Sequence, residues 1–372
     1  MKRLANIVLN DFTNDSRVLK TSNSLNHMNF RVTVVALHNK GLKEKENIDG
    51  VEVKRIKILT RQLPKLRFFQ YLKFIEFIFR AVWQFRNYDY IHCNDLNALP
   101  VGLFIKFISK KDTKVVYDCH EYETERINIK GLEKFLTKIL ERSLINFPDC
   151  IITVSDSIAN EYVNLYKIPK PKIVLNCPVF KKQPKCNIFR EKFDLNEQQK
   201  IFLYQGLFGN GRGINRLINV FSQFKDKEDV IIFMGYGPLY NKIKSAAENN
   251  INIFLHQSVD INVLLSYTSS ADYGMALIDD VCLNYRYCLP NKIFEYLMAG
   301  IPFIGSNLTE MSKFIENTNT GIIAHDNSFK GIKNSINSIK KIDTNIFEKN
   351  IKEAVKIYNW EEQEKVLKNI YI

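Results

Sequence analysis

No stretch of the 372 residues approaches the roughly 20 consecutive apolar residues that a membrane-spanning helix needs. The seven cysteines form neither a CxxC pair nor a Cys/His cluster at zinc spacing, and their odd number does not suit a disulfide scaffold. With only 15 glycines and 10 prolines, the chain is neither collagen-like nor of low complexity. The start, MKRLANIVLN, becomes polar too early for a signal peptide. We therefore expect a cytoplasmic protein, either soluble or peripheral on the inner face of the cytoplasmic membrane.

What the chain has is an ordinary globular composition with an excess of positive charge. Hydrophobic residues make up 45% and charged residues 25%, and 53 Lys and Arg against 40 Asp and Glu give a net charge of +13. At roughly 100 to 200 residues per domain, the length predicts two domains. The charge favours anionic partners, but no compact basic motif or aromatic RNA-binding signature is present, so we do not expect nucleic acid among them.

Short β-branched runs alternate with longer helical stretches, which predicts βαβ units and parallel sheets. The first series is ANIVL, RVTVVAL, YDYIHC, TKVVYD and DCIITV, and a second series begins near residue 200 with IFLYQG, DVIIFMG, INIFL, ADYGMAL and IPFIG. We predict an α/β protein whose two parallel-sheet domains, 1–178 and 200–357, face each other across a cleft and are joined by a charged linker, 179–199. Ligands of open parallel sheets bind beyond the carboxyl ends of the strands, so the loops there are the candidate sites.

The first such loop, NDFTNDSRVLK, lacks the glycines of a dinucleotide-binding turn. We predict that Ser16 caps a helix from Arg17 onward, whose exposed N–H groups can hold an anion. A capped helix with solvated polar residues is the alternative.

Two further strand exits, IHCNDLNALP and VVYDCHEYETE, bring several titratable residues to one sheet edge. His120 lies among carboxylates and is a candidate for proton transfer or for a contact with a sugar hydroxyl. His92, Asp95, Asp118 and Glu121 could converge with it on a metal, but no short ligand motif supports that alternative. We therefore expect no metal site.

In the second half, YQGLFGNGRGINRLI places four glycines and Arg212 in a turn between a strand and a helix, where backbone and guanidinium can approach phosphate oxygens. The segment CLPNKIFEYLMAGIPFIG carries the stronger pattern. Pro290 begins a helix whose N–H groups and dipole can meet a diphosphate, and Lys292 adds a cation. One turn further, Glu295 can accept hydrogen bonds from vicinal ribose hydroxyls.

Taken together, these segments resemble the glycosyltransferases of family 4, which have the GT-B fold of two facing Rossmann-like domains. The resemblance runs over nearly the whole chain, through NDSRVLK, RVTVVAL, IHCNDLNALP, VVYDCHEYETE, IITVSDSIANEY, the glycine turn, MGYGP and PNKIFEYLMAGIP. The ending YNWEEQEKVLKNIYI resembles the helix that crosses back to the first domain in this fold, here about 358–372.

The resemblance implies transfer of a hexosyl or N-acetylhexosaminyl group from a nucleotide-sugar donor to an acceptor hydroxyl, with retention at the anomeric carbon. No cofactor or essential metal is expected. The donor would lie on the second domain, with Glu295 on the ribose, Arg212 and Lys292 on the diphosphate, and the Pro290 and Asn291 backbone on the phosphate or sugar.

The resemblance also assigns residues near the nucleobase and in the first domain. His256, Gln257 and Ser258 would lie near the base, and His120 would contact the transferred sugar as the catalytic residue. The acceptor side would be lined by Asn14, Asp15, Arg17, Asp95, Asp118 and Glu121.

Two positions depart from the family pattern. Tyr287 stands where many members have the first of two glutamates, the one that often contacts the sugar, so the sugar must be held differently. Gly206 is followed by Leu207 where members commonly have an arginine, and Lys292 is the residue that can compensate.

The segment PKLRFFQYLKFIEFIFRAVWQFRN, 64–87, reads as a helix with one narrow polar stripe and an otherwise apolar surface. Two interpretations stay open. The helix is buried against its own domain, or residues 55–87 contact an anionic membrane, with Arg55, Lys57, Arg61 and Lys65 on the headgroups. Membrane contact would suit a lipid-linked glycan acceptor, as in the assembly of bacterial surface polysaccharide, lipopolysaccharide or capsule.

Other functions on the same frame are a nucleotide-sugar epimerase, a phosphorylase with a lysine-bound pyridoxal cofactor, or a non-catalytic nucleotide-sugar-binding protein. Epimerisation would proceed without an acceptor, and a phosphorylase would show the absorbance of its cofactor. The binding protein is an alternative because Tyr287 replaces an expected glutamate.

Overall fold

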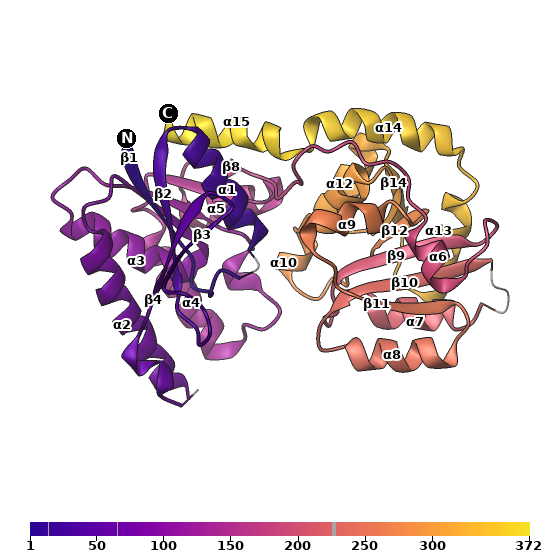
Figure 1. The fold of residues 1–372 in the computed structure, drawn as a ribbon, viewed down its shortest axis with the longest axis horizontal. Helices are drawn as coiled ribbons and strands as arrows, with labels where there is room; N and C mark the ends of the chain where they lie inside the picture. Colours follow the sequence, from indigo (N-terminus) through magenta and orange to yellow (C-terminus); the bar gives the residue numbers. More distant parts are fainter. Residues whose placement is uncertain (14, 65, 225–227) are drawn as a thin grey trace. The chain divides into compact units, whose positions relative to one another are not determined.

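The computed structural model describes residues 1–13, 15–64, 66–224 and 228–372, which divide into two compact units (Figure 1). The first contains Met1–Val174 and Glu364–Ile372, and the second contains Leu175–Gln363. The segment expected to be a linker, 179–199, therefore belongs to the second unit. It includes helix α6 (Ile188–Phe193), whose Phe189 is fully buried.

The first unit is built on an eight-stranded sheet in the order β3-β4-β2-β1-β5-β6-β7-β8, parallel except for the pair β3 and β4. The five strands predicted for this half are confirmed as β1, β2, β5, β6 and β7. The prediction missed β3, β4 and β8, which are partly exposed or only two residues long. The strands are β1 (Lys2–Ile7), β2 (Phe30–Leu37), β3 (Lys45–Ile48), β4 (Val51–Ile56), β5 (Tyr90–Asn94), β6 (Lys114–Asp118), β7 (Cys150–Thr153) and β8 (Lys172–Ile173).

Helices pack against this sheet, and the end of the C-terminal helix belongs to the same unit. Helix α3 packs on β5 and β6 and lies between α2 and α4. The last turns of α15 belong to this unit, where the Tyr371 ring packs against Phe30 and Tyr90. The helical elements are α1 (Ser16–His27), η1 (Leu59–Gln62), α2 (Arg67–Phe85), α3 (Asp95–Ile108), η2 (Glu123–Glu125), α4 (Gly131–Leu144), α5 (Asp156–Tyr166) and α15 (Trp360–Tyr371).

The second unit is built on a six-stranded parallel sheet in the order β11-β10-β9-β12-β13-β14. All five strands predicted here are confirmed, and β14 is additional. Strand β10 is buried except for its last residue, and residues 201–205 of β9 are buried, which explains their apolar runs. The strands are β9 (Lys200–Leu207), β10 (Asp229–Tyr236), β11 (Ile253–Gln257), β12 (Tyr273–Ala276), β13 (Phe303–Ser306) and β14 (Gly321–Ala324).

Helix α11, which carries the Glu295 segment, is fixed tightly to this sheet. The Tyr296 hydroxyl donates to the carbonyls of Leu203 (2.9 Å) and Met275 (3.2 Å), and a Cβ at Gly274 would collide with the Tyr296 ring. The remaining helices are α7 (Ile214–Phe221), α8 (Tyr240–Asn249), α9 (Ile261–Thr268), α10 (Leu283–Arg286), α11 (Asn291–Met298), α12 (Thr309–Thr318), α13 (Phe329–Ile339) and α14 (Thr344–Ile357). No helix among the described residues is long and apolar enough to cross a bilayer.

Candidate functional site

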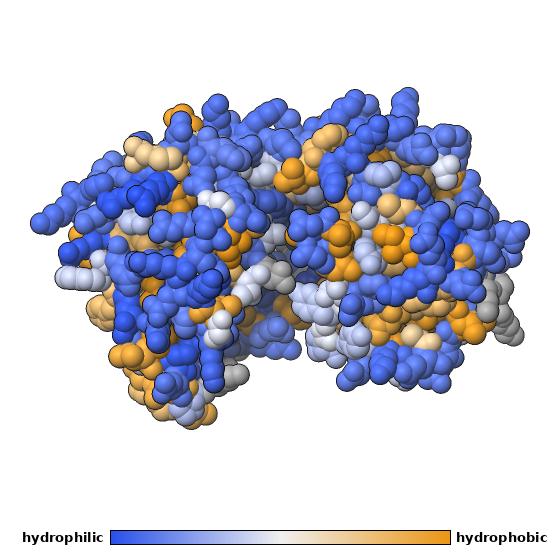
Figure 2. All heavy atoms as spheres, in the orientation of Figure 1, coloured by the Kyte–Doolittle hydropathy of each residue, from blue (hydrophilic) through white to orange (hydrophobic). Residues whose placement is uncertain are grey.

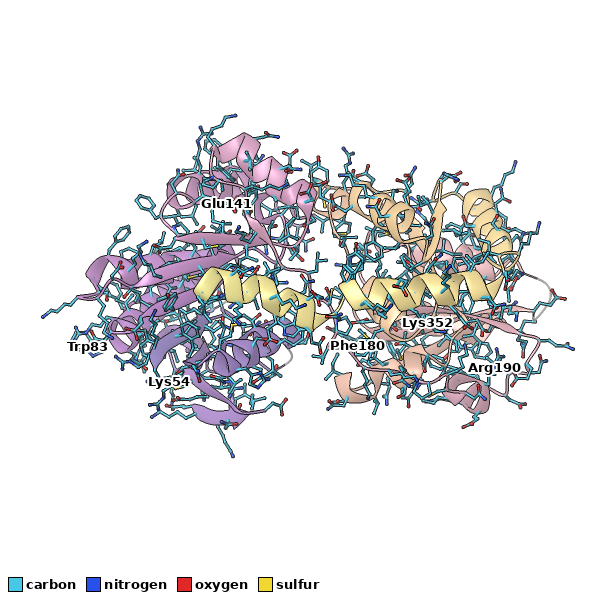
Figure 3. The ribbon with its side chains drawn as sticks, turned by 90° about the horizontal axis from the view of Figure 1, so that it is seen from above. Lys54, Trp83, Glu141, Phe180, Arg190 and Lys352 are labelled. Atoms are coloured by element: carbon cyan, nitrogen blue, oxygen red, sulfur yellow. The ribbon has the colours of Figure 1, made fainter. Side chains whose placement is uncertain are left out.

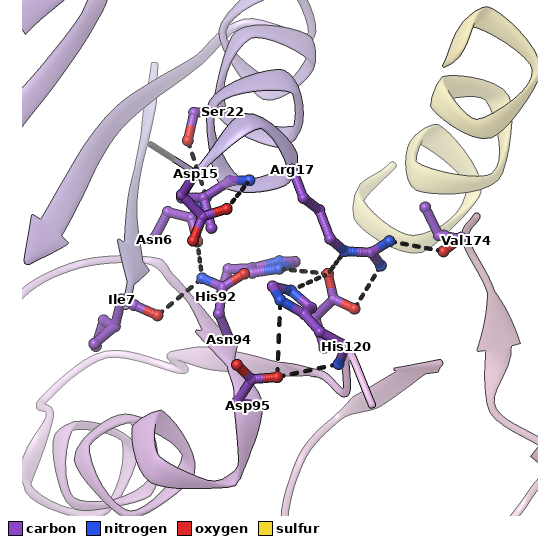
Figure 4. A network of polar contacts seen from close by, with 12 residues as sticks. Asn6, Ile7, Asp15, Arg17, Ser22, His92, Asn94, Asp95, His120 and Val174 are labelled. Atoms are coloured by element: carbon purple, nitrogen blue, oxygen red, sulfur yellow. Dashed lines mark hydrogen bonds and ion pairs between the residues drawn. The ribbon is translucent and has the colours of Figure 1, made fainter. Parts of the chain in front are cut away.

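A buried ion pair organises the carboxyl edge of the first sheet (Figure 4). Arg17, from α1, donates to both carboxylate oxygens of Asp118 at the end of β6, from Nη2 to Oδ1 at 2.7 Å and from Nε to Oδ2 at 3.1 Å. A third donor, Nη1, reaches the Val174 carbonyl at 2.9 Å. Arg17 is 4% exposed and Asp118 is 1% exposed, so neither charge is solvated. The predicted acceptor-side residues Arg17 and Asp118 thus form one fixed unit.

Two histidines face the same carboxylate. The Nε2 atoms of His92 and His120 each lie 3.4 Å from Asp118 Oδ2, and the His92 ring is held from its other side by the Tyr371 hydroxyl. Burial favours the neutral form of Asp118, but Arg17 and His120 outweigh it and hold the pKa of this carboxyl well below its usual range. Among the described residues no group of three or more His, Cys, Asp and Glu is placed to hold a metal ion.

His120 and Asp95 are the titratable groups of this network that reach its surface, with side chains 19% and 35% exposed. The Nδ1 atom of His120 lies 3.7 Å from Asp95 Oδ1, which also accepts from the His120 backbone N–H at 3.1 Å. Burial opposes the charged imidazolium, but Asp95 and Asp118 together raise the pKa of His120 above its ordinary value. The two carboxylates therefore favour the protonated ring, which is a hydrogen-bond donor at this edge.

Asp95 adopts an uncommon backbone conformation to make these contacts. It begins α3 at a φ of 62°, in the left-handed region that few non-glycine residues occupy. Behind it, burial and the carboxylate of Asp95 raise the pKa of Glu123 well above its ordinary value. Burial and the neighbouring carboxylate thus favour the protonated, neutral form of Glu123.

The start of α1 differs in detail from the prediction. The helix begins at Ser16, but the cap is Asp15, whose Oδ1 accepts from the Val18 N–H at 3.2 Å; the prediction that Ser16 is the cap was wrong by one residue. The Asp15 carboxylate, which also accepts from the Asn10 amide at 2.9 Å, takes the place of the anion we expected there. Asn14 lies outside the described residues, and Glu121 is exposed.

In the second unit, the glycine turn after β9 holds Arg212 against an aromatic ring. Gly213 has a φ of 70°, and a Cβ there would lie 2.6 Å from that of Leu277, so only glycine fits. The Arg212 guanidinium lies 5.2 Å from the centroid of the Tyr285 ring, and its Nε is buried without a hydrogen-bond partner among the described residues.

Lys292 lies beside Arg212 and is equally unusual. It is 7% exposed, and its Nζ is 3.5 Å from the centroid of the Tyr204 ring. Burial, and then repulsion by Arg212, lower the pKa of Lys292 well below its ordinary value, while Glu295 acts in the opposite direction. No ion pair found among the described residues includes Arg212 or Lys292. Glu295 is the one carboxylate that acts on Lys292, and it makes no ion pair with either cation among the described residues, so the two neighbouring positive charges form a site suited to a multiply charged anion.

Glu295 is oriented by a chain of hydrogen bonds. Its Oε2 accepts from the Gln205 side-chain amide, and the Gln205 Oε1 in turn accepts from the Thr268 hydroxyl at 2.8 Å. The carboxylate is half-buried and lies on the first turns of α11, whose start at Pro290 and Asn291 has no side-chain cap. One helix and one glycine turn therefore bring together backbone N–H groups, two cations and a fixed carboxylate.

His256 is placed differently from its neighbours Gln257 and Ser258. It is 3% exposed, packs in a cluster of aromatic rings and hydrogen-bonds with Lys192 Nζ at 2.9 Å and with the Gln257 carbonyl at 2.7 Å. Burial lowers its pKa, so the ring is neutral at physiological pH. Gln257 and Ser258 are exposed at the end of β11 and remain the candidates for contacts with a nucleobase.

Several residues of these networks were missed by sequence reasoning. Tyr204 and Gln205 lie within the YQG segment that was singled out for its glycine, and a polar residue at the end of a buried strand was the available signal. Thr268, Tyr285 and Tyr371 come from distant helices, and no local pattern marks them.

Comparisons with known proteins agree with this two-domain fold. The model of Glycosyltransferase Family 4 matches residues 16–178, and the model of Glycosyl transferases group 1 matches residues 187–357. Sucrose-phosphate synthase from Thermosynechococcus elongatus is 16% identical, with a TM-score of 0.81 over 100% of this chain and 98% of that one. Anabaena HepE in complex with UDP and glucose is 12% identical, with a TM-score of 0.76 over 100% and 99%. WaaG, a glycosyltransferase involved in lipopolysaccharide biosynthesis, is 13% identical, with a TM-score of 0.71 over 99% of each chain.

Proposed function

We propose that this chain is an active glycosyltransferase. It belongs to glycosyltransferase family 4, and the domain of that family is followed by a group 1 glycosyl transferase domain in a GT-B fold. It transfers a hexosyl or N-acetylhexosaminyl group from a nucleotide sugar to an acceptor hydroxyl, with retention of the anomeric configuration. The reaction needs no cofactor and no essential metal.

The observation that carries this proposal is the cation pair of the second unit. Lys292 is buried and Arg212 is half-buried with its Nε fully enclosed, and neither forms an ion pair among the described residues, which costs free energy in the absence of a ligand. A nucleoside diphosphate supplies the missing negative charge. Glu295, held by Gln205, then accepts hydrogen bonds from the two ribose hydroxyls, and the exposed Gln257 lies near the base.

Catalysis follows from electrostatics and positioning. As the bond between the sugar and the diphosphate breaks, negative charge grows on the phosphate, and Arg212, Lys292 and the N–H groups of α11 stabilise it. The departing phosphate accepts the proton of the acceptor hydroxyl. His120, whose protonated form Asp95 and Asp118 favour, donates a hydrogen bond to the transferred sugar and holds it in place.

We further propose that the acceptor is a glycan or lipid-linked glycan of a bacterial surface polysaccharide, and that the enzyme works in the cytoplasm or at the inner face of the cytoplasmic membrane. The likeness to WaaG supports this setting, and so does the exposed apolar helix α2, the centre of the membrane contact predicted for residues 55–87.

The test is turnover by the full chain in the presence of a metal chelator. UDP-glucose is the first donor to try, because HepE was solved with it, followed by other UDP-, GDP- and ADP-sugars. Release of the nucleoside diphosphate measures donor cleavage, and proton NMR of the product reports whether the anomeric configuration is retained. Glu295→Ala and His120→Ala should reduce turnover, whereas Glu316→Ala, at an exposed position on α12, should not.

Three outcomes would contradict the proposal. Inversion of the anomeric centre would exclude the retaining mechanism, and full dependence on a divalent metal would exclude the proposed role of the cation pair. Tight nucleotide binding with neither hydrolysis nor transfer would instead identify a non-catalytic binding protein, the reading that Tyr287 in place of a glutamate allows.

A further inference from the structure

The outer surface of the first unit carries an apolar face made by three neighbouring helices. Large hydrophobic side chains on α2, α3, α4 and the turn after α4 are between 41% and 71% exposed. We call this surface the α2–α4 face. Its members are Phe68, Tyr71, Ile75, Phe79, Trp83, Phe104, Phe107, Ile108, Leu132, Phe135, Leu136, Ile139, Leu140 and Phe147.

Helix α2 has three stripes that differ in their surroundings, and the first of them fits the interpretation that the helix is buried against its own domain. One stripe, including Phe77 and Phe85, is buried against the unit. A second, polar stripe folds onto the preceding segment, where Glu76 accepts from the N–H groups of Leu59 and Thr60 at 2.8 Å. The third stripe, from Phe68 to Trp83, recurs at helical spacing and faces outward uncovered.

Helix α4 has the opposite orientation to an ordinary amphipathic helix, because its apolar side faces outward. Its buried residue is a carboxylate, Glu141, which accepts hydrogen bonds from the hydroxyls of Tyr117 (2.9 Å), Tyr162 (2.7 Å) and Tyr166 (2.6 Å). Its leucine, isoleucine and phenylalanine side chains, at spacings of three and four residues, point outward instead. Burial of Glu141 among the three tyrosines fixes this orientation. Turning the apolar side inward would break these three hydrogen bonds and leave the tyrosine hydroxyls without their acceptor.

Helix α3 makes the surface continuous. It packs against both α2 and α4, and the exposed Phe107 ring meets Phe147 edge to face at 5.6 Å. Figure 2 shows hydrophobic side chains gathered over α2, and Trp83 lies at the edge of the unit in Figure 3. Soluble monomers rarely expose a contiguous apolar surface of this kind without a partner for it.

The charges around the face decide which partner fits. Exposed cations on or beside the same helices are Arg86, Lys110, Lys130 and Arg142, whereas Lys138, also exposed, pairs with Glu125 at 2.7 Å. The Arg86 guanidinium lies 4.1 Å from the Trp83 ring centroid, which is the pairing of an aromatic anchor with a headgroup-binding cation. A second copy of this chain would bring the same cations together across a twofold axis, and they would repel. An anionic bilayer is complementary to both the apolar and the cationic parts of the face.

We propose that the α2–α4 face docks on a membrane containing anionic phospholipid, with the apolar side chains of α2, α3 and α4 entering the interface and the surrounding cations on the headgroups. This surface differs from the contact predicted for residues 55–87. Arg55 is 3% exposed and bonded to the carbonyl oxygens of Asp11, Phe12 and Lys43, so its predicted role at the headgroups was wrong, and Lys65 lies outside the described residues.

The two tryptophans provide a local probe. Trp83 is 70% exposed on the face, whereas Trp360 is 5% exposed. Full-length protein titrated with vesicles of equal parts phosphatidylcholine and phosphatidylglycerol should float with them, and its tryptophan emission should shift to shorter wavelength. Trp83→Phe should abolish the spectral shift and retain flotation, whereas Trp360→Phe should retain both.

Single charges placed in the face should weaken binding without unfolding the protein. Phe79→Asp and Ile139→Asp replace side chains that are 71% and 49% exposed, and each should lower vesicle affinity at least tenfold. Ile346→Asp is the matched control, because Ile346 is 54% exposed on α14 of the second unit, and it should bind as the wild type does. Arg142→Gln should lower affinity about fivefold, and added salt should weaken wild-type binding.

Donor cleavage in solution should be measured on the same variants, and substitutions in the α2–α4 face should leave it unchanged. This assay therefore tests the glycosyltransferase activity separately from membrane docking. Absence of wild-type flotation at any phosphatidylglycerol content would overturn the membrane proposal. So would equal binding by the Ile139→Asp variant, or a concentration-dependent dimer that Ile139→Asp dissociates, which would make the face an interface between copies.

Discussion

Replacing Lys292 by methionine should stabilise the ligand-free protein while destroying its affinity for nucleotide. Lys292 is 7% exposed and lies against the Tyr204 ring, with Arg212 nearby and no ion pair among the described residues. Desolvating an ammonium costs several kcal/mol, of which the ring returns about 2 kcal/mol. Methionine fills a similar volume without this cost, so we expect a net gain of about 2 kcal/mol.

For a unit of this size, such a gain raises the melting temperature by about 4 to 8 °C, which scanning calorimetry resolves. The pH dependence gives a second check. Between the lowered pKa of Lys292 and its ordinary value of 10.5, the unfolded chain holds the proton and the folded chain does not, so the stability of the wild type rises with pH. The advantage of the Lys292→Met variant should therefore be largest at neutral pH and shrink toward pH 10.5.

The control is Lys340→Met in the same unit. Lys340 pairs with Asp229, whose side chain is 9% exposed, and its loss should lower the melting temperature. Excess UDP should raise the melting temperature of the wild type and leave that of Lys292→Met unchanged. A Lys292→Met variant that melts below the wild type would refute the reasoning, because attraction to Glu295 and the Tyr204 ring would then outweigh the desolvation of Lys292 in the ligand-free protein.

Three further outcomes are expected. Glu295→Gln should weaken nucleotide-sugar binding about 10- to 100-fold by calorimetry, since it removes charge-assisted hydrogen bonds to the ribose; unchanged affinity would remove Glu295 from the site. Asp95→Asn should lower the pKa of His120, so the alkaline limb of the pH profile of kcat should move to lower pH; a profile that does not move would exclude protonated His120 from the reaction. Arg17→Met should destabilise the first unit by about 3 to 5 kcal/mol, because Asp118 would remain buried without its partner; a loss below about 1 kcal/mol in denaturant unfolding would contradict the buried-pair account.

Most sheet strands could be predicted from the sequence because each is marked by its own run of apolar residues. Runs such as RVTVVAL and DVIIFMG are buried on both sides of a parallel sheet, so they remain apolar without alternation. Strand β8 has two residues, and β3 is a partly exposed edge strand, and neither carries such a signal.

The candidate site was predictable only where its residues lie in one segment. Pro290, Lys292 and Glu295 come from a single helix start, and that arrangement could be read from their spacing. The support for Glu295 comes from Gln205 and Thr268, which are 90 and 27 residues away, and only the fold joins them.

The outward face of α4 shows the same limit. Its sequence, GLEKFLTKILERSL, reads as an amphipathic helix whose apolar side should face the core. Three tyrosines from β6 and α5 bind Glu141 and reverse that orientation. A pattern within one helix cannot show which of its sides finds the better partners.

The central claim, that the second unit binds a diphosphate between Arg212 and Lys292, is tested most directly by calorimetric titration of the full chain with nucleoside diphosphates. UDP, GDP and ADP should be compared with the corresponding monophosphates and nucleosides, without metal. The account predicts that one diphosphate binds, that its monophosphate binds at least tenfold more weakly, and that Lys292→Met removes the difference. Failure of every diphosphate to bind, or equal affinity for the diphosphate and the nucleoside, would contradict it.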